Sequence, residues 1–331
     1  MCLVALAIDH SRRFPLVIAA NRDEHFSRAA ARLAWWTPEA GNPAILGGRD
    51  LEAGGTWMGL TAEGRLALVT NVRDPARNDP TAPSRGRIVP EWLRGRERTD
   101  RFWMRTALSG YNGFNLLAFD FRAGECVFAS NDGRHPQRLE RGIHGLSNAS
   151  LDTPWPKVVA LKSQLHDALA SAESVDTLAA HLFDALADRS EAADDDLPHT
   201  GIPLERERQL SAAFIRTPDL GYGTRCSTLV ITEKVNRHLV THVLERTFSA
   251  NGSVALLRRS TLKDWPPRYA VDAQTGFTAS AQEVVSEAQL AEEPAIKRVR
   301  TLLKPDLTKK KRREPSPREG SPLPRTRDRA A

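Results

Sequence analysis

The sequence predicts an α+β protein, with helices gathered in the middle of the chain and strands towards both ends. Apolar stretches of strand length begin at residue 3 and recur between residues 66 and 130 and between residues 228 and 244. Apolar positions at helical spacing lie between residues 154 and 214 instead. The two patterns do not alternate regularly, so a repeated β-α-β arrangement is not predicted.

The first two strands are predicted to form a hairpin. Leu3–Ile8 and Leu16–Ala20 are apolar, and the polar residues Asp9–Arg13 between them are typical of a hairpin connection. Five further strands are predicted at Leu66–Thr70, Asn115–Phe119, Cys126–Ser130, Thr228–Thr232 and His238–Leu244. Because side chains alternate along a strand, His238 and His242 are expected together on the outer face of the last one.

Three helices are predicted in the middle of the chain. The first follows Asp152-Thr153-Pro154, which supplies a capping residue and a proline for the first turn. Its apolar stripe consists of Val158, Leu161, Leu165, Ala168 and Leu169. The second helix is expected at Val175–Ala187 and the third at Glu205–Phe214, with Ser190–Pro198 as a loop between them.

Residues 1–272 are predicted to form one folded domain. Residues 273–304 are an ambiguous edge of it, with a short helix expected near Ile296–Leu303. Residues 305–331 are predicted to be a disordered, basic, proline-rich tail with too little apolar content to fold. The tail holds nine basic and four acidic residues and so carries +5 of the net charge of +6. The folded part is then close to neutral, which predicts no specific nucleic-acid partner.

The composition favours a cytoplasmic protein with a sizeable core. Apolar residues make up 40% of the chain and charged residues 27%, and no apolar run is long enough to predict a membrane span. No basic segment precedes the first apolar stretch, so no signal peptide is expected. The three cysteines and nine histidines show no metal-binding spacing. We therefore predict no metal and no cofactor, and reduced cysteines.

Cys2 is the first candidate catalytic residue. A small second residue allows Met1 to be removed, which would leave Cys2 with both a thiol and a free α-amine. Such an amine has a pKa of about 7.7–8.0 and can act as a general base at neutral pH. Nucleophile and base would then belong to one residue, as in other N-terminal nucleophiles. The alternative is an arbitrary small residue at a frayed end, which the buried strand starting at Leu3 disfavours.

The polar run Asn21-Arg22-Asp23-Glu24 follows the second strand directly. If the strand continues, Asn21 and Asp23 share one face, while Arg22 and Glu24 share the other. One amide and one carboxylate can then reach the Cys2 amine on the neighbouring strand. The alternative is a solvated strand end with a weak Arg–Glu ion pair.

Four more residues are candidates by position. Trp57 lies between glycine-rich turns, where it either lines a pocket or packs in the core. Asn71 ends a predicted strand and Asn148 precedes the first predicted helix, so each is either an oxyanion donor or a turn residue. Arg225, in a glycine-containing turn, can lie beside a thiolate and favour its ionised form, whereas Cys226 is interpreted as a small buried residue.

Taken together, these segments resemble the NRDE family, also called the transport and Golgi organisation protein 2 family. The matching blocks, in order, are Met1-Cys2, Asn21–Glu24, Gly54–Gly59, Thr70–Arg73, Ala82–Gly86, Tyr111–Leu116, His144–Asn148, Pro154–Lys157, Leu197–Gly201 and Tyr222–Thr228. That family is similar to cysteine-type N-terminal-nucleophile hydrolases, which include penicillin V acylases and bile-salt hydrolases. The resemblance implies a four-layer α-β-β-α sandwich with two antiparallel sheets.

The resemblance also implies roles for individual residues. Cys2 would be the nucleophile, Asp23 would orient its amine, Asn71 and Asn148 would contact the oxyanion, and Arg225 would tune the thiol. Ligand contacts are assigned to Asn21, Arg22, Glu24, Trp57, Arg73 and Tyr222.

Two functions remain open from the sequence, both with a small molecule as the partner. The first is hydrolysis of a non-peptide C–N bond, an amide, through Cys2. The alternative is a non-catalytic protein that binds or traffics haem or acyl-coenzyme A in the same cleft. Trp57, Trp155 and Tyr222 would then supply apolar walls, and Arg22, Arg73 or Arg225 would meet propionates or phosphates.

Overall fold

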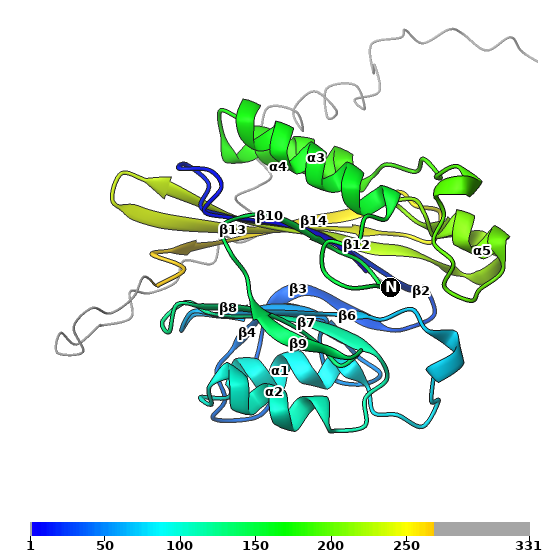
Figure 1. Ribbon diagram of the computed structural model, residues 1–331. Helices are drawn as coiled ribbons and strands as arrows, with labels where there is room; N and C mark the ends of the chain where they lie inside the picture. The colour runs from blue at the N-terminus through cyan, green and yellow to red at the C-terminus, as the bar shows by residue number, and fades with distance from the viewer. Residues whose placement is uncertain (1, 268–331) are drawn as a thin grey trace, which may run out of the picture. The chain divides into compact units, whose positions relative to one another are not determined.

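The computed structural model describes residues 2–267, which form four layers: helices, sheet, sheet, helices (Figure 1). Every strand pair in these residues is antiparallel. The α+β class and the α-β-β-α sandwich are therefore confirmed. The expected edge at 273–304 and the tail at 305–331 lie outside the described residues, as do residues 268–272 of the predicted domain.

The first sheet has the order β10-β1-β2-β12-β13-β14, with β11 paired to β12. Its strands are β1 (Cys2–Ile8), β2 (Leu16–His25), β10 (Gly142–Leu146), β11 (Arg216–Thr217), β12 (Tyr222–Val235), β13 (His238–Phe248) and β14 (Val254–Lys263). The second sheet runs in chain order from β3 to β9. Its strands are β3 (Ala30–Trp36), β4 (Ile45–Asp50), β5 (Met58–Thr61), β6 (Arg65–Asn71), β7 (Phe114–Asp120), β8 (Glu125–Ser130) and β9 (Arg134–Arg138).

Helices cover the outer face of each sheet (Figure 1). The first sheet is covered by α3 (Pro156–Ser171) and α4 (Val175–Leu186), and the second by α1 (Ile88–Arg94) and α2 (Thr99–Ala107). Pro156 starts α3 at a position where the missing N–H costs nothing, and Ser174 caps α4 in a capping box with Thr177. None of the helices within residues 2–267 is long and apolar enough to cross a membrane.

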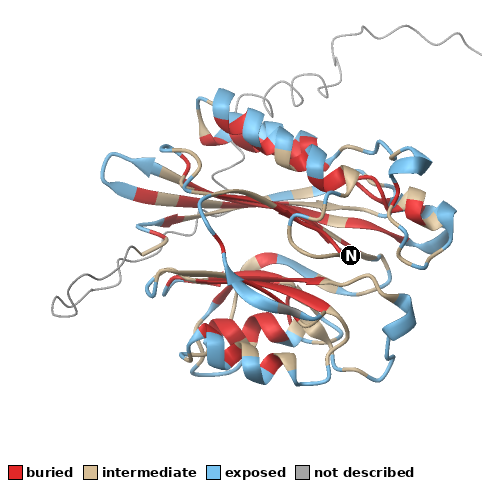
Figure 2. Ribbon diagram, viewed as in Figure 1, coloured by how far each residue is buried: buried red, intermediate tan, exposed pale blue. Residues whose placement is uncertain are grey.

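Alternation along β1 divides the core into two parts, and burial runs through both sheets (Figure 2). Leu3 and Ala5 pack under α3 and α4, whereas Val4 and Leu6 pack between the two sheets. By the same alternation, the side chain of Cys2 points into the space between the sheets. A ligand site that includes Cys2 is therefore expected at this end of the space between the sheets.

The predicted strands are all present, and the second one is longer than predicted. β2 continues to Arg22 between β1 and β12, and from there to His25 by pairing with β12 alone, where Tyr222 lies opposite His25. His238 and His242 do lie on one strand, β13. The predicted hairpin between β1 and β2 is also confirmed.

The third predicted helix is wrong in its second half. Helix α5 (Leu204–Gln209) ends early, because the N–H of Phe214 donates to the Asp188 carbonyl at 2.7 Å and draws the chain back beside α4. Helices α1 and α2 were not predicted, nor were the strands other than the seven named above.

Candidate active site

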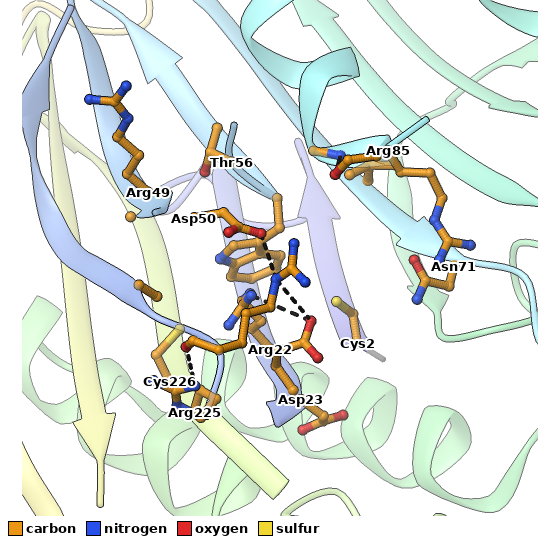
Figure 3. A pocket seen from close by; sticks show the side chains of 18 of the residues that line it. Cys2, Arg22, Asp23, Arg49, Asp50, Thr56, Asn71, Arg85, Arg225 and Cys226 are labelled. Carbon is orange, nitrogen blue, oxygen red and sulfur yellow. Dashed lines mark hydrogen bonds and ion pairs between the residues drawn. The ribbon is translucent and has the colours of Figure 1, made fainter. Parts of the chain in front are cut away.

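Cys2 lies at the start of β1, an inner strand between β10 and β2. Only 6% of the residue is exposed, and it lines a cleft of about 620 Å³ (Figure 3). Ends of both sheets and the segment from Asn78 to Gly86 form the walls of this cleft. The expectation that Cys2 is fixed in the fold and faces a cleft agrees with this geometry.

Contrary to expectation, the pKa of the Cys2 thiol is raised, not lowered. While Met1 is present, burial raises this pKa to about 11. The positive charges of the chain terminus and of Arg22 oppose the rise only in part. Burial likewise raises the pKa of Cys126 to about 12 and that of Cys226 well above its usual value. Desolvation of a thiolate outweighs its cationic neighbours here, so Cys2 needs a base to react at neutral pH.

Arg22 and Glu24 share one face of β2, as the alternation predicted, and this face lines the cleft. Their charged groups lie 3.5 Å apart. Arg28 also lines the cleft, and its Nε donates to Asp50 at 2.8 Å. The carboxylate of Asp50 in turn accepts from the N–H of Ala53, and these bonds lower its pKa although burial opposes them.

Asn21 lies on the opposite face of β2 and does not reach Cys2, contrary to expectation. Its Nδ2 donates to the carbonyls of Leu186 and Ala213, at 2.8 and 2.9 Å, and its Oδ1 accepts from Ser227 at 2.6 Å. The amide is thereby committed to holding β2 against the helical layer. A strand continued by polar residues predicts which face Asn21 takes, but not that helices cover that face.

Asp23 is buried and lies at the edge of the cleft. Its Oδ1 accepts from the Thr224 hydroxyl at 2.7 Å, and its carbonyl accepts from the Tyr222 hydroxyl at 3.1 Å. Burial raises the pKa of Asp23, while the positive charges of the chain terminus and Lys157 oppose the rise. Asp23 is thus near the amino end of β1, where its predicted role requires it.

Lys157 was not singled out from the sequence, although it closes the block Pro154–Lys157. It lies on α3 with only 5% of its surface exposed, and its Nζ donates to the Leu210 carbonyl at 2.7 Å. Burial lowers its pKa to about 8, against the attraction of Asp23. Its place in that block was the only signal in the sequence, because its burial becomes visible only in the folded structure.

Asn71 and Asn148 have different positions relative to the cleft. Asn71 lines the cleft, whereas Asn148 is buried behind it and donates from Nδ2 to the Asn71 carbonyl at 2.9 Å. The neighbouring Ser147 donates from Oγ to the Cys2 carbonyl at 3.0 Å. These bonds tie the end of β6 in the second sheet to Cys2 in the first.

Arg225 lines the cleft but is not positioned to tune Cys2, contrary to expectation. It stands at the irregularity of β12 between Thr224 and Cys226, and its Nη1 donates to the carbonyls of His25 and Arg28 at 2.6 and 2.9 Å. Its guanidinium carbon lies 5.2 Å from the centre of the Phe26 ring. Arg225 therefore fastens the connection between β2 and β3.

Of the predicted apolar walls, Trp57 lines the cleft, and Tyr222 is buried beside Asp23. Arg73 lies outside the cleft wall, where it forms a buried ion pair with Glu207 at 2.6 Å and packs over the Trp155 ring at 4.9 Å. Glu207 also accepts from the N–H of Thr200 at 2.9 Å. Arg73 and Trp155 are therefore parts of the support behind the site.

Among residues 2–267 no cluster of three or more metal-ligating side chains occurs, and none of the cleft-lining residues is a histidine. The charged lining is instead dominated by arginine and carboxylate. The arginines of the lining are Arg22, Arg28, Arg32, Arg49, Arg85 and Arg225, and the carboxylates are Asp23, Glu24, Asp50, Asp79 and Glu245.

The antiparallel α-β-β-α sandwich, with a cleft around a cysteine at the start of an inner strand, is the architecture that the resemblance to N-terminal-nucleophile hydrolases implied. The chain belongs to the Transport and Golgi organisation 2 family, whose model matches residues 1–250. It is 31% identical over 287 residues to the Transport and Golgi organization protein 2 homolog of Bos taurus, covering 81% of this chain and 96% of that protein. It is also 31% identical over 251 residues to the Homo sapiens homolog, covering 70% and 89%.

Two solved structures with similar arrangements are both hydrolases. One is the Caenorhabditis elegans ortholog of N-acylethanolamine-hydrolyzing acid amidase, with a TM-score of 0.41 and 8% identity, covering 70% of this chain and 92% of that one. The other is a mutant of the conjugated bile acid hydrolase from Clostridium perfringens, with a TM-score of 0.37 and 8% identity, covering 83% and 100%.

Proposed function

We propose that this protein hydrolyses a non-peptide C–N bond of a small amide, with Cys2 as the nucleophile once Met1 has been removed. The observation that carries the proposal is the position of Cys2, which opens on a cleft of about 620 Å³ while its strand is pinned inside the first sheet. A cavity of this size accommodates a small molecule, and a rigid strand end fixes the nucleophile.

The α-amine exposed by removal of Met1 is the proposed base. The Cys2 thiol has a pKa raised to about 11 by burial, whereas a free α-amine titrates at about 7.7–8.0 and can accept the thiol proton. Sγ then attacks the carbonyl carbon, and the ammonium returns the proton to the leaving nitrogen as the C–N bond breaks. Water attacks the resulting thioester and loses a proton to the amine, and the C–S bond breaks as the ammonium returns that proton to Sγ.

Asp23 and Asn71 complete the proposed machinery. Asp23, anchored by Thr224, would hold the α-ammonium, since a buried carboxylate favours a nearby positive charge. Asn71 would donate to the oxyanion from the cleft wall, a contact that can contribute roughly 3–4 kcal/mol to transition-state stabilisation. Asn148 would act indirectly through its bond to the Asn71 carbonyl.

Ligand contacts are proposed for the residues whose side chains line the cleft: Arg22, Glu24 and Trp57. The other three predicted contacts, Asn21, Arg73 and Tyr222, are engaged behind the cleft and are assigned to its support. Arg225 is assigned to holding the β2–β3 connection.

Intact-mass measurement of the purified protein tests the first requirement. A chain that keeps Met1 has no α-amine on Cys2, and this mechanism is then excluded. If Met1 is absent, N-acyl arylamines should acylate Cys2 transiently and release the free arylamine. The Cys2→Ser variant should lose multiple turnover, and the matched Cys226→Ser variant, which changes another cleft cysteine, should keep it.

The second candidate is non-catalytic binding of haem or acyl-coenzyme A in the same cleft. The arginine-rich lining favours it, because arginine recognises carboxylates and phosphates bidentately. For haem, the missing histidine in the lining is unfavourable. Titration of the protein with haem and with acyl-coenzyme A tests this candidate: saturable binding without consumption of the ligand supports it, and no saturable binding rejects it.

A further inference from the structure

Arg85 is one of the arginines that line the cleft. The residue is only partly exposed, and its Nη1 donates to the Gly113 carbonyl at 2.9 Å. Within residues 2–267 it forms no ion pair with a carboxylate. Burial lowers the pKa of Arg85, and negative charges on Cys2 and Glu24 oppose that effect, although neither group is in an ion pair with the guanidinium. A desolvated cation without an anionic partner is costly, so its retention in a cleft indicates a ligand.

The backbone that carries Arg85 is held in place by its own turn and by the segment at Gly55 and Thr56. Arg85 begins a short 3-10 helix (Arg85–Arg87), where the Ser84 hydroxyl accepts from the N–H of Gly86 at 3.3 Å. The Gly86 carbonyl accepts from the N–H of Thr56 at 3.0 Å. A Cβ on Gly55 would lie 2.1 Å from the Gly86 oxygen, so this approach requires glycine at position 55.

Three of the sequence blocks therefore meet at one side chain. Gly54–Gly59 supports the segment, Ala82–Gly86 carries the arginine, and Tyr111–Leu116 supplies the carbonyl of Gly113. Neither the predicted chemistry nor the fold alone requires these blocks to converge. Preorganisation of this kind is expected for a group that must meet a ligand in a fixed position.

The neighbouring arginines differ from Arg85 in their partners. Arg22 lies 3.5 Å from Glu24, Arg28 is paired with Asp50, and Arg225 donates to two carbonyls. In Figure 3, Arg85 and Asn71 lie together on one side of Cys2, with Arg22 on the other. Arg85 is thus the cleft arginine that combines proximity to Cys2 with a guanidinium in no ion pair within residues 2–267.

We propose that Arg85 binds an anionic group of the ligand, a carboxylate or a phosphate, next to the Sγ of Cys2. This rests on the proposed function in one respect: it restricts the substrate to acyl compounds that carry an oxyanionic group close to the scissile bond. The binding itself requires no turnover.

Alkylation of Cys2 by two reagents of similar size tests the proposal. Iodoacetate is anionic and iodoacetamide is neutral. The first adds a carboxymethyl group and the second a carbamoylmethyl group to the same thiolate, each with loss of iodide. Their rate ratio at Cys2, measured by peptide mass spectrometry, cancels any change in the thiol pKa. Arg85→Gln should lower the iodoacetate-to-iodoacetamide ratio about tenfold, the factor of one charge-assisted hydrogen bond.

Arg49→Gln is the matched control, because Arg49 lines the same cleft but packs over the Trp36 ring at 4.8 Å. It should change the ratio less than about twofold, because its Nε donates to the Gly54 carbonyl and Figure 3 shows it across the cleft from Cys2, whereas Arg85 lies beside Cys2. An unchanged ratio in Arg85→Gln, or an equal fall in Arg49→Gln, overturns the proposal.

The glycine contact gives a second comparison that keeps Arg85 in place. Gly55→Ala should shift Arg85 and lower the ratio, whereas a Cβ on Gly86 would meet its nearest atom at 3.4 Å, so Gly86→Ala should not.

If the Arg85→Gln variant fails to fold, an experiment on the wild-type protein tests the proposal. Protection of Cys2 from iodoacetamide by inorganic phosphate or by succinate supports the proposal and identifies the anion, and no protection by either overturns it. Anion binding without hydrolysis contradicts the proposed function alone.

Discussion

Strand β2 ends in polar residues on both faces, and the two faces are completed differently. Below the helices lies a support cluster, defined as Asn21, Asp23, Lys157 and Glu207, in which each residue is buried and has a hydrogen-bond partner. On the cleft face, Arg22 and Glu24 are partly exposed and lie 3.5 Å apart, and Glu24 has a second, longer ion pair of 4.0 Å with Arg28.

The difference shows how one strand can be both rigid and receptive. Buried polar groups must be satisfied within the protein, so the support cluster fixes the backbone. Groups on the cleft face keep unused hydrogen-bonding capacity for a ligand. Substitutions in the support cluster should therefore affect stability strongly, whereas substitutions on the cleft face should affect reactivity and leave stability nearly unchanged.

The largest effect on stability is expected from Glu207→Gln. Its partner Arg73 has a side chain only 7% exposed, and that of Glu207 is 3% exposed, so the change leaves a buried guanidinium without its carboxylate. Breaking such a pair costs about 3–5 kcal/mol of unfolding free energy. Urea unfolding measures this loss. Glu205→Gln, on the same helix but with a 65% exposed side chain, should cost less than ~1 kcal/mol, and equal losses would contradict the burial argument.

Lys157 gives the support cluster a characteristic pH dependence. Its pKa is about 8 in the folded protein and 10.5 in the unfolded reference, so between these values the unfolded state binds more protons. The unfolding free energy should then rise with pH across this window, by about 3 kcal/mol at most.

The measurement is the difference in unfolding free energy between wild type and Lys157→Met from pH 7 to pH 11. Cys2, whose raised pKa acts in the opposite direction above pH 9, is present in both proteins and cancels in this difference. A difference that stays constant with pH would show that Lys157 is not desolvated.

Asn21→Ala should cost about 2–3 kcal/mol, because it leaves the carbonyls of Leu186 and Ala213 without their donor. Glu24→Gln, three residues further along the same strand on the cleft face, should cost less than ~1 kcal/mol. Chemical denaturation of both variants tests the contrast directly. Similar losses for the two would mean that the faces of β2 do not differ as described.

Local sequence patterns predicted the inner layers of the fold better than the outer ones. The strands at Leu3–Ile8 and Thr228–Thr232 are continuous apolar runs, typical of strands buried on both faces, and they were found. Helix α1 was missed because Ile88–Arg94 is short and begins without a side-chain cap. The extension of β2 depends on pairing with β12, some two hundred residues away, which no local pattern contains.

The candidate site was predictable as a set of residues, but less so as a set of contacts. Alternation correctly placed Arg22 on the opposite face of β2 from Asp23, but it did not show which of the two faces lines the cleft. It could not show that carbonyls of His25 and Arg28 would capture Arg225, since those atoms are present at any sequence. Nor could it show that burial of Cys2 would outweigh its cationic neighbours, because desolvation depends on the packed layers.

The smallest free-energy effect, and the most informative for the cleft face, concerns the state of the chain terminus. The positive charge at the terminus of the chain that carries residue 1 already lowers the Cys2 pKa, although burial dominates. Removal of Met1 brings that charge onto the nitrogen of Cys2 itself, so the thiol pKa should fall further. A fall of about one unit corresponds to roughly tenfold faster alkylation by iodoacetamide near pH 8.

Cys126, away from the cleft lining, is the internal control and should react equally slowly in both forms. The two forms can be prepared by expression with and without excess methionine aminopeptidase and compared by peptide mass spectrometry. Equal Cys2 rates in the two forms would mean that the α-amine does not act on the thiol, and the cleft face would then have only its arginines to offer a ligand.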